Sequence, residues 1–119
     1  MKRDLDLVRK ILFQVEEKGQ ARGFVDLEIP SHNPEEISHH VWLLQNAGLI
    51  EAQNLSTNRG IDYRPSKMTW LGHEFLDAAR NDTVWRKTKE LVKEKGGSVP
   101  FEVLKSLLVK AAASLFALS

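Results

Sequence analysis

NPEEISHHVWLLQNAGLIEA, residues 33 to 52, has the pattern of a capped helix that continues directly into a strand. Asn33 is a favoured N-cap residue, and Pro34 has the fixed φ that suits the first helical position. Glu36 lies three residues after the cap, where its side chain can reach back to the unpaired backbone N–H groups. The start of this helix is therefore well defined by its sequence.

Gly48 predicts the end of the same helix. Ile37, Val41 and Leu44 share one face at helical spacing, and Gly48 stands where a left-handed residue would end the helix. Leu49 and the following residues then turn inward as a strand. A helix that leads into a β-ribbon in this way is the centre of a winged-helix domain, and we expect that architecture.

The residues before this helix predict another helix and a short strand. Apolar residues at helical spacing run through residues 4–18, and Gly19 ends the pattern. From Phe24 to Ile29 apolar and acidic residues alternate, which indicates a half-buried strand that Pro30 stops. No room remains for the helix that usually precedes a recognition helix, so the first helix or the turn at residues 19–23 must take that role. The apolar stripe of the first helix comprises Leu5, Val8, Ile11, Leu12 and Val15.

The residues after residue 48 predict a two-stranded wing and a further helix. Residues 49–54 and 61–68 would pair, joined by LSTNRG, whose Asn and Gly favour a turn. Pro65 cannot donate to a ladder, so the return strand lies at an edge or contains a bulge. Thr69 can cap the next helix, whose buried side would carry Phe75, Leu76 and Ala79.

The remainder of the chain predicts appended helices. Asn81 or Asp82 would cap a segment that ends at Gly96, and residues 69–95 form either one bent helix or two. The last helix starts at Ser98, with Pro100 in its first turn. We therefore predict an α+β fold with a winged-helix-like domain at residues 1–80 and a helical extension at residues 81–119.

Apolar residues of the last helix alternate by three and four, the spacing of a helix-packing interface. This helix either closes the domain core or docks onto a second copy to form a homodimer, and the sequence leaves both alternatives open. The residues of this pattern are Phe101, Leu104, Leu108, Ala111, Leu115 and Leu118.

Composition places limits on the function. A chain of 119 residues with 42% apolar and 28% charged residues is expected to form one modest core. A net charge of +1 does not indicate a dedicated polyanion binder, so any basic face must be local. The absence of cysteine excludes disulfides and thiolate metal sites. No signal peptide or membrane span is evident, and we expect a cytoplasmic protein without membrane partners.

Four segments of the chain resemble domain of unknown function 2513, a family of small bacterial and phage proteins. The segments are MKRDLDLVRKIL, EEISHHVWLLQNAGLIEA, MTWLGHEFLDAARNDTVWRKTK and KEKGGSVPFEVLK, in this order along the chain. The resemblance implies no settled activity. ISxxVxxLxxAGLI also looks like the recognition helix and first wing strand of many bacterial winged-helix repressors, and TWLGHEFL looks like the helix that follows their wing.

The central helix carries candidate DNA contacts. With Ile37, Val41 and Leu44 in the core, its solvent-facing residues are expected to be Ser38, His39, Trp42 and Gln45. Gln can pair with adenine, and Ser or His can reach base edges or phosphates. Residues 34–50 contain no Lys or Arg, however, and carboxylates near phosphate oppose binding. The alternative is a solvated helix with an acidic first turn, in which Trp42 is a core residue or the anchor for a partner.

The wing carries a second set of candidate DNA contacts. The basic residues of the wing outnumber its acidic residues. The basic residues are Arg59 at the turn and Arg64 and Lys67 on the return strand, and the acidic residues are Glu51 and Asp62. An Arg at a wing tip can enter a minor groove. Basic residues are equally common on solvated strand edges, where their charge blocks aggregation.

The histidines do not form a recognisable metal motif. His39 and His40 point about 100° apart on a helix, and the sequence has no HExxH pair. We expect no metal and no cofactor, and we interpret His40 as a partly buried ring with one satisfied nitrogen. His73 adjoins Glu74 without a nucleophile, so we expect no enzymatic activity.

Two functions are consistent with these patterns. The first is a non-catalytic DNA-binding module, similar to a transcription regulator, that contacts duplex DNA through the central helix and the wing. The second is a protein-interaction adaptor that uses the same scaffold, with Trp42 and the last helix as apolar anchors. Fold alone does not choose between them.

Overall fold

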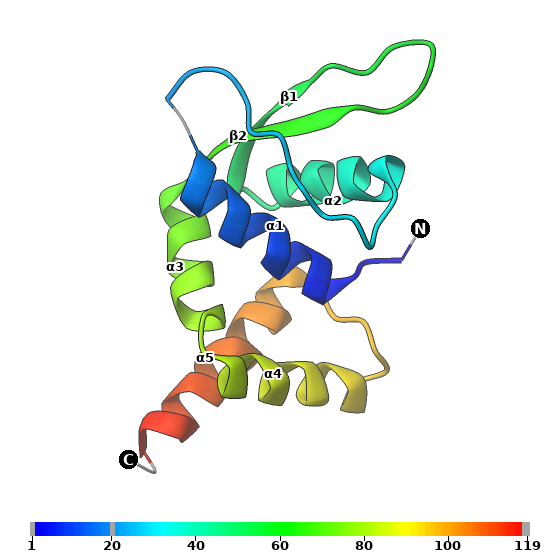
Figure 1. The fold of residues 1–119 in the computed structure, drawn as a ribbon. Helices are drawn as coiled ribbons and strands as arrows, with labels where there is room; N and C mark the ends of the chain where they lie inside the picture. The colour runs from blue at the N-terminus through cyan, green and yellow to red at the C-terminus, as the bar shows by residue number, and fades with distance from the viewer. Residues whose placement is uncertain (1, 20, 118–119) are drawn as a thin grey trace. The chain divides into compact units, whose positions relative to one another are not determined.

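The computed structural model describes residues 2–19 and 21–117, except for the side chains of residues 116 and 117. Leu118, predicted to continue the apolar pattern of the last helix, lies outside the described residues. Helices and a two-stranded antiparallel sheet share the chain (Figure 1), which confirms the predicted α+β class. The elements are α1 (Leu5–Lys18), α2 (Pro34–Asn46), β1 (Ile50–Asn54), β2 (Tyr63–Met68), α3 (Trp70–Ala79), α4 (Asp82–Glu94) and α5 (Phe101–Ala117).

The chain forms two compact units, Met1–His73 and Glu74–Ser119. The division falls inside α3, whereas the sequence placed it after residue 80. No helix among the described residues combines the length and the apolar character needed to cross a bilayer.

Helix α1 has Asp4 as its N-cap, and the Asp4 side chain accepts a hydrogen bond from the Leu7 N–H. The predicted apolar stripe is buried with one exception, because Leu5 is half-exposed and Leu7 is buried in its place. The other buried residues of α1 are Val8, Ile11, Leu12 and Val15.

Helix α2 starts and ends as its sequence predicts. The Asn33 side chain accepts a hydrogen bond from the Glu36 N–H at 2.8 Å, and Pro34 is the first helical residue. Gly48, just beyond the helix end, has a φ of 79°, the left-handed conformation expected there. Figure 1 shows α2 lying along the β1–β2 hairpin, against which it packs.

The hairpin is antiparallel, with Ile50 opposite Met68 and Asn54 opposite Tyr63. Its register is irregular between Glu51 and Ala52, and Pro65 pairs with Ala52 directly beyond that point. This agrees with the expectation that Pro65 lies at an edge or a bulge. The end of the hairpin is closed by a bridge between residues 57 and 60.

The predicted strand from Phe24 to Ile29 is wrong. The alternation of burial is present, with Val25 and Ile29 buried and the acidic residues exposed, but the segment does not form a strand. The Val25 N–H donates to the Pro65 carbonyl at 2.7 Å, and Pro65 has no N–H with which to extend that pairing. Further along, the Gln14 side-chain amide bonds both the N–H and the carbonyl of Glu28, each at 2.8 Å. A side chain therefore satisfies backbone groups that a strand would have paired.

The second unit contains α4, α5 and most of α3. Helices α3 and α4 are separate, because Asn81 caps α4 by accepting hydrogen bonds from the Thr83 and Val84 N–H groups. Helix α5 begins at Phe101 rather than at Ser98. It packs against α4, and the Phe101 ring stacks on Phe75 with centroids 5.9 Å apart.

Candidate functional site

On α2 the structure corrects two of the predicted DNA contacts, Ser38 and Gln45. Ser38 is 5% exposed, and its hydroxyl accepts a hydrogen bond from the Tyr63 N–H at 3.1 Å. Gln45 donates to the Ala52 carbonyl at 3.2 Å. Residues seven apart lie on the same side of a helix, and this side faces the hairpin. Ser38 is therefore buried against the hairpin, and half-buried Gln45 is bonded to it, so neither is the free solvent-facing residue that was predicted.

The solvent side of α2 carries an aromatic pair. The His39 ring stacks on Trp42, with centroids 5.8 Å apart and an angle of 28° between the rings, and Trp42 is 38% exposed. Burial and the neighbouring His40 lower the pKa of His39 below its ordinary value, so this ring is uncharged at neutral pH. Of the predicted helix contacts, these two face outward, and they present an apolar surface without positive charge.

The basic residues of the hairpin differ in their surroundings. Arg64 bonds Asp62 and Asp26, each at 3.1 Å, and lies over the Phe24 ring. The hydrogen bonds that Arg64 donates to the Asp62 carboxylate raise the pKa of Arg64 above its ordinary value. Lys67 pairs with Glu51 at 3.3 Å. Two of the three predicted wing contacts are thus ion-paired within the chain.

Arg59 is the third of these residues. It lies at the exposed end of the hairpin, within the turn closed by residues 57 and 60. Its guanidinium makes no hydrogen bond or ion pair with the residues that the structure describes. Arg59 is therefore the predicted basic contact best placed to reach a ligand.

A cleft of about 230 Å³ lies between the extended segment after residue 24, the first half of α2, and β2. Sites for drug-sized ligands usually enclose roughly 300–1,000 Å³. The size of this cleft favours a contact for a single side chain of a partner over a small-molecule site. It is lined by Val25, Asp26, Leu27, Pro34, Ile37, Ser38, Asp62, Tyr63, Arg64 and Pro65.

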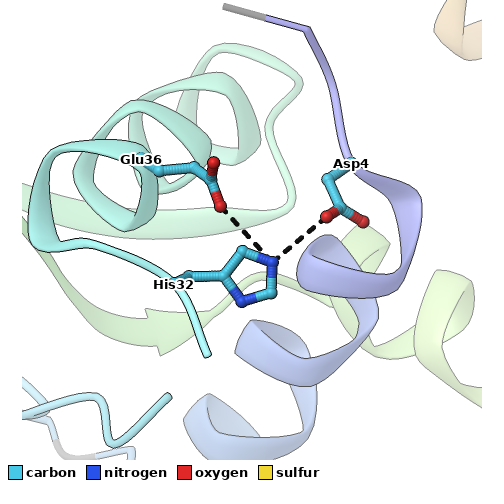
Figure 2. A group of neighbouring side chains, drawn as sticks. All are labelled: Asp4, His32 and Glu36. Carbon is cyan, nitrogen blue, oxygen red and sulfur yellow. Dashed lines mark hydrogen bonds and ion pairs between the residues drawn. The ribbon is translucent and has the colours of Figure 1, made fainter. Parts of the chain in front are cut away.

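A second group of polar residues was not predicted from the sequence. Asp4, His32 and Glu36 come from the start of α1, the loop before α2, and the first turn of α2, and Figure 2 shows both carboxylates pointing at the same imidazole nitrogen. Nε2 of His32 lies 3.1 Å from Asp4 Oδ2 and 3.3 Å from Glu36 Oε1. No local signal in the sequence indicates this group, because His32 precedes the N-cap of α2, where the spacing rule for pairs within a helix does not apply, and Asp4 is distant in the chain.

The surroundings of Asp4 keep its carboxylate charged. Burial raises the pKa of Asp4, but the Leu7 N–H and the contact with His32 outweigh this effect, so the pKa lies below its ordinary value. A charged carboxylate at this position also suits the N-terminal end of α1. The Glu36 side chain contacts His32, a role that its predicted place in a capping box did not reveal.

His40 joins the same two helices from inside the protein. The ring is fully buried, its Nε2 accepts a hydrogen bond from the Asp4 N–H, and its Nδ1 donates to the Glu36 carbonyl, each at 2.8 Å. Because a backbone N–H points at Nε2, the proton must lie on Nδ1. The ring was predicted to be partly buried with one satisfied nitrogen; it is fully buried, and both nitrogens are satisfied.

Comparison with models of protein families identifies the family to which the chain belongs. Residues 2–98 match the model of the family described as hypothetical protein (DUF2513). The chain belongs to the DUF2513 family. The resemblance inferred from the four sequence segments is therefore confirmed.

A relative of this DUF2513 protein is an uncharacterized protein of Haemophilus influenzae. The two are 39% identical over 108 residues, which cover 90% of this chain and 92% of the relative. No solved structure gave a significant match. Neither the family description nor the name of the relative states an activity.

The predicted dimer contacts of this DUF2513 protein lie beyond the family match, in α5. Leu104 is 6% exposed and Leu108 is 1% exposed, so both side chains are already covered within a single copy of the chain. Phe101 and Leu115 are half-buried. Of the two alternatives for this helix, burial supports the one in which α5 closes the core of its own chain.

Proposed function

We propose that this DUF2513 protein is a non-catalytic, winged-helix-like module that binds a protein partner through α2. The order α1, α2, β1, β2, α3, with α2 lying along the hairpin, supports the winged-helix-like description. The observation that carries the proposed function is the exposed Trp42 with its stacked His39. Exposed Trp residues are frequent centres of protein interfaces, because a large rigid ring is buried at little entropic cost.

Electrostatics favour a protein partner over duplex DNA on this face. Glu35, His39, Trp42 and Asn46 follow one another at helical spacing along the outward side of α2. This row contains a carboxylate and no cation, whereas a DNA-binding face needs positive charge to release counterions from phosphate. The partner that fits places an apolar or aromatic side chain against Trp42 and a basic side chain near Glu35.

Photocrosslinking in the native host tests this function. A photoreactive residue at exposed position 46, one turn beyond Trp42, should give a discrete protein adduct. Trp42→Ala should reduce that adduct at least about tenfold, because truncating a central interface Trp typically costs 2 kcal/mol or more. Trp70→Ala is the matched control, since Trp70 is also exposed but lies on α3, and it should leave the adduct intact. Absence of an adduct, or an adduct that persists in Trp42→Ala, would contradict the proposal.

Duplex DNA is the second candidate, and Arg59 is the observation that favours it. An exposed Arg in a hairpin turn has the reach needed to enter a minor groove. One such residue supplies little affinity, because each phosphate contact contributes only a small part of the electrostatic term.

We expect no saturable binding of random duplex DNA by fluorescence anisotropy at either about 50 or about 200 mM salt, the range over which phosphate contacts lose most affinity. The protein-partner proposal would be contradicted if the protein bound duplex DNA with an affinity that falls steeply as salt rises and that weakens in Arg59→Ala. That result would favour DNA binding by the hairpin. Arg86→Ala, an exposed position on α4, provides the matched control for a change in net charge.

A further inference from the structure

We propose that Asp4, His32 and Glu36 form a binding site for a divalent transition-metal ion such as Zn²⁺ or Mn²⁺. The site offers one imidazole nitrogen and two carboxylate oxygens, which is a donor set that such ions accept. The inference is independent of the proposed partner surface, because it concerns how the start of α1 is joined to α2.

The distances between the donor atoms suit a shared ion. Nε2 of His32 is 3.1 Å from Asp4 Oδ2 and 3.3 Å from Glu36 Oε1, and one donor atom from each residue lies within 4.8 Å of the other two. Ligands held about 2.1 Å from one ion are separated by about 3.0 Å at octahedral angles and about 3.4 Å at tetrahedral angles. Small side-chain adjustments would therefore bring all three donors onto one ion.

The alternative to a metal ion at this position is a proton on Nε2 of His32, which stabilises the two carboxylates less well than an ion would. A single N–H aims along one direction, so it cannot make a straight hydrogen bond to two carboxylates at once. The two negative charges also repel each other across the imidazole. A divalent ion would bind both carboxylates and offset both charges.

Neighbouring groups hold the three ligands in place. The Leu7 N–H bonds Oδ1 of Asp4 at 3.1 Å and leaves Oδ2 directed at the cluster. The Ser31 hydroxyl lies 3.1 Å from Nδ1 of His32, the nitrogen that would not face the ion. Such outer contacts orient metal-binding imidazoles and carboxylates in established sites. The imidazole is also largely covered, with 14% of its side chain exposed.

Binding would link three separate stretches of the first unit. Asp4 precedes α1, His32 lies in the loop before α2, and Glu36 belongs to the first turn of α2. An ion that binds the folded chain and not the unfolded chain raises the unfolding temperature as its concentration rises. The site therefore predicts metal-dependent thermal stability as well as metal binding.

Isothermal titration of the untagged full-length protein with Zn²⁺ and with Mn²⁺ tests the site. We expect saturable binding of one ion per chain for at least one of them, accompanied by a higher unfolding temperature. Glu36→Gln removes one anionic ligand with little change of shape and should weaken binding at least about tenfold. Glu35→Gln removes the same charge from the adjacent exposed position and should leave binding unchanged.

A second pair of variants tests whether metal binding needs the His32 imidazole or any histidine of the chain. His32→Ala should abolish one-to-one binding, whereas His73→Ala, at an exposed position, should retain it. Far-ultraviolet circular dichroism tests whether each variant is folded. If His32→Ala does not fold, the comparison of Glu36→Gln with the natural sequence decides the result. The proposal is overturned if neither ion binds at one per chain, or if Glu36→Gln binds as tightly as the natural sequence.

Discussion

Gly72→Ala is expected to lower the free energy of unfolding of the first unit by at least about 2 kcal/mol. A Cβ at position 72 would lie 2.0 Å from the carbonyl oxygen of Leu49 and 3.0 Å from its carbonyl carbon. Both are backbone atoms, so no side-chain rotation relieves the overlap. Alanine is the better helix former by about 1 kcal/mol, but this gain is smaller than the cost of separating α3 from the start of the hairpin.

Urea denaturation followed by circular dichroism measures this effect. The matched control is Gly48→Ala, where nothing lies within 4 Å of the added Cβ but φ is 79°. That variant should lose only about 1–2 kcal/mol, the cost of a left-handed conformation for a residue with a side chain. If Gly72→Ala were as stable as the natural sequence, this result would contradict the close packing of α3 on the Leu49 carbonyl.

Leu108→Ala is expected to destabilise the second unit by about 2–5 kcal/mol, the range for truncating a buried leucine. Leu108 is 1% exposed and lies on the face of α5 that also buries Leu104 and Ala111. The lost contacts and the resulting cavity both reduce stability. Hydrogen exchange of the α4 and α5 amides measures this loss without interference from the first unit.

The neighbouring residue provides the control for this prediction. Val109 is 57% exposed, so Val109→Ala should change stability by no more than about 0.5 kcal/mol. The effect of Leu108→Ala should not depend on protein concentration if α5 closes its own unit. The dimer alternative would be favoured if the stability of the natural protein rose with protein concentration and that of Leu108→Ala did not.

The sequence predicted the features that depend on local chemistry. Asn33 and Pro34 define the start of α2, Gly48 adopts the left-handed conformation, and Asn81 separates α4 from α3. Each of these signals lies within a few residues of the structure that it specifies. The periodicity of α1 likewise predicted its buried face, with an error at Leu5.

The features that sequence missed depend on contacts between distant residues. The apolar pattern of α2 alone predicts that Ser38 faces solvent, but the hairpin covers that side, and the Tyr63 N–H of the hairpin needs an acceptor. Residues 24–29 have the alternation of a strand, yet their neighbour in the fold is Pro65, which cannot donate. Asp4 and His32 are far apart in the chain, so no spacing rule could place them together.

The hydrogen bond between the Asp4 N–H and buried His40 fixes the minimum length of a shortened form of this protein. Trimming the chain past its fourth residue would remove the donor and leave Nε2 enclosed without a partner. Replacing the Asp4 side chain alone would keep the peptide N–H and therefore this bond. For this pair the backbone, rather than the identity of the amino acid, determines how far truncation from the amino terminus can proceed.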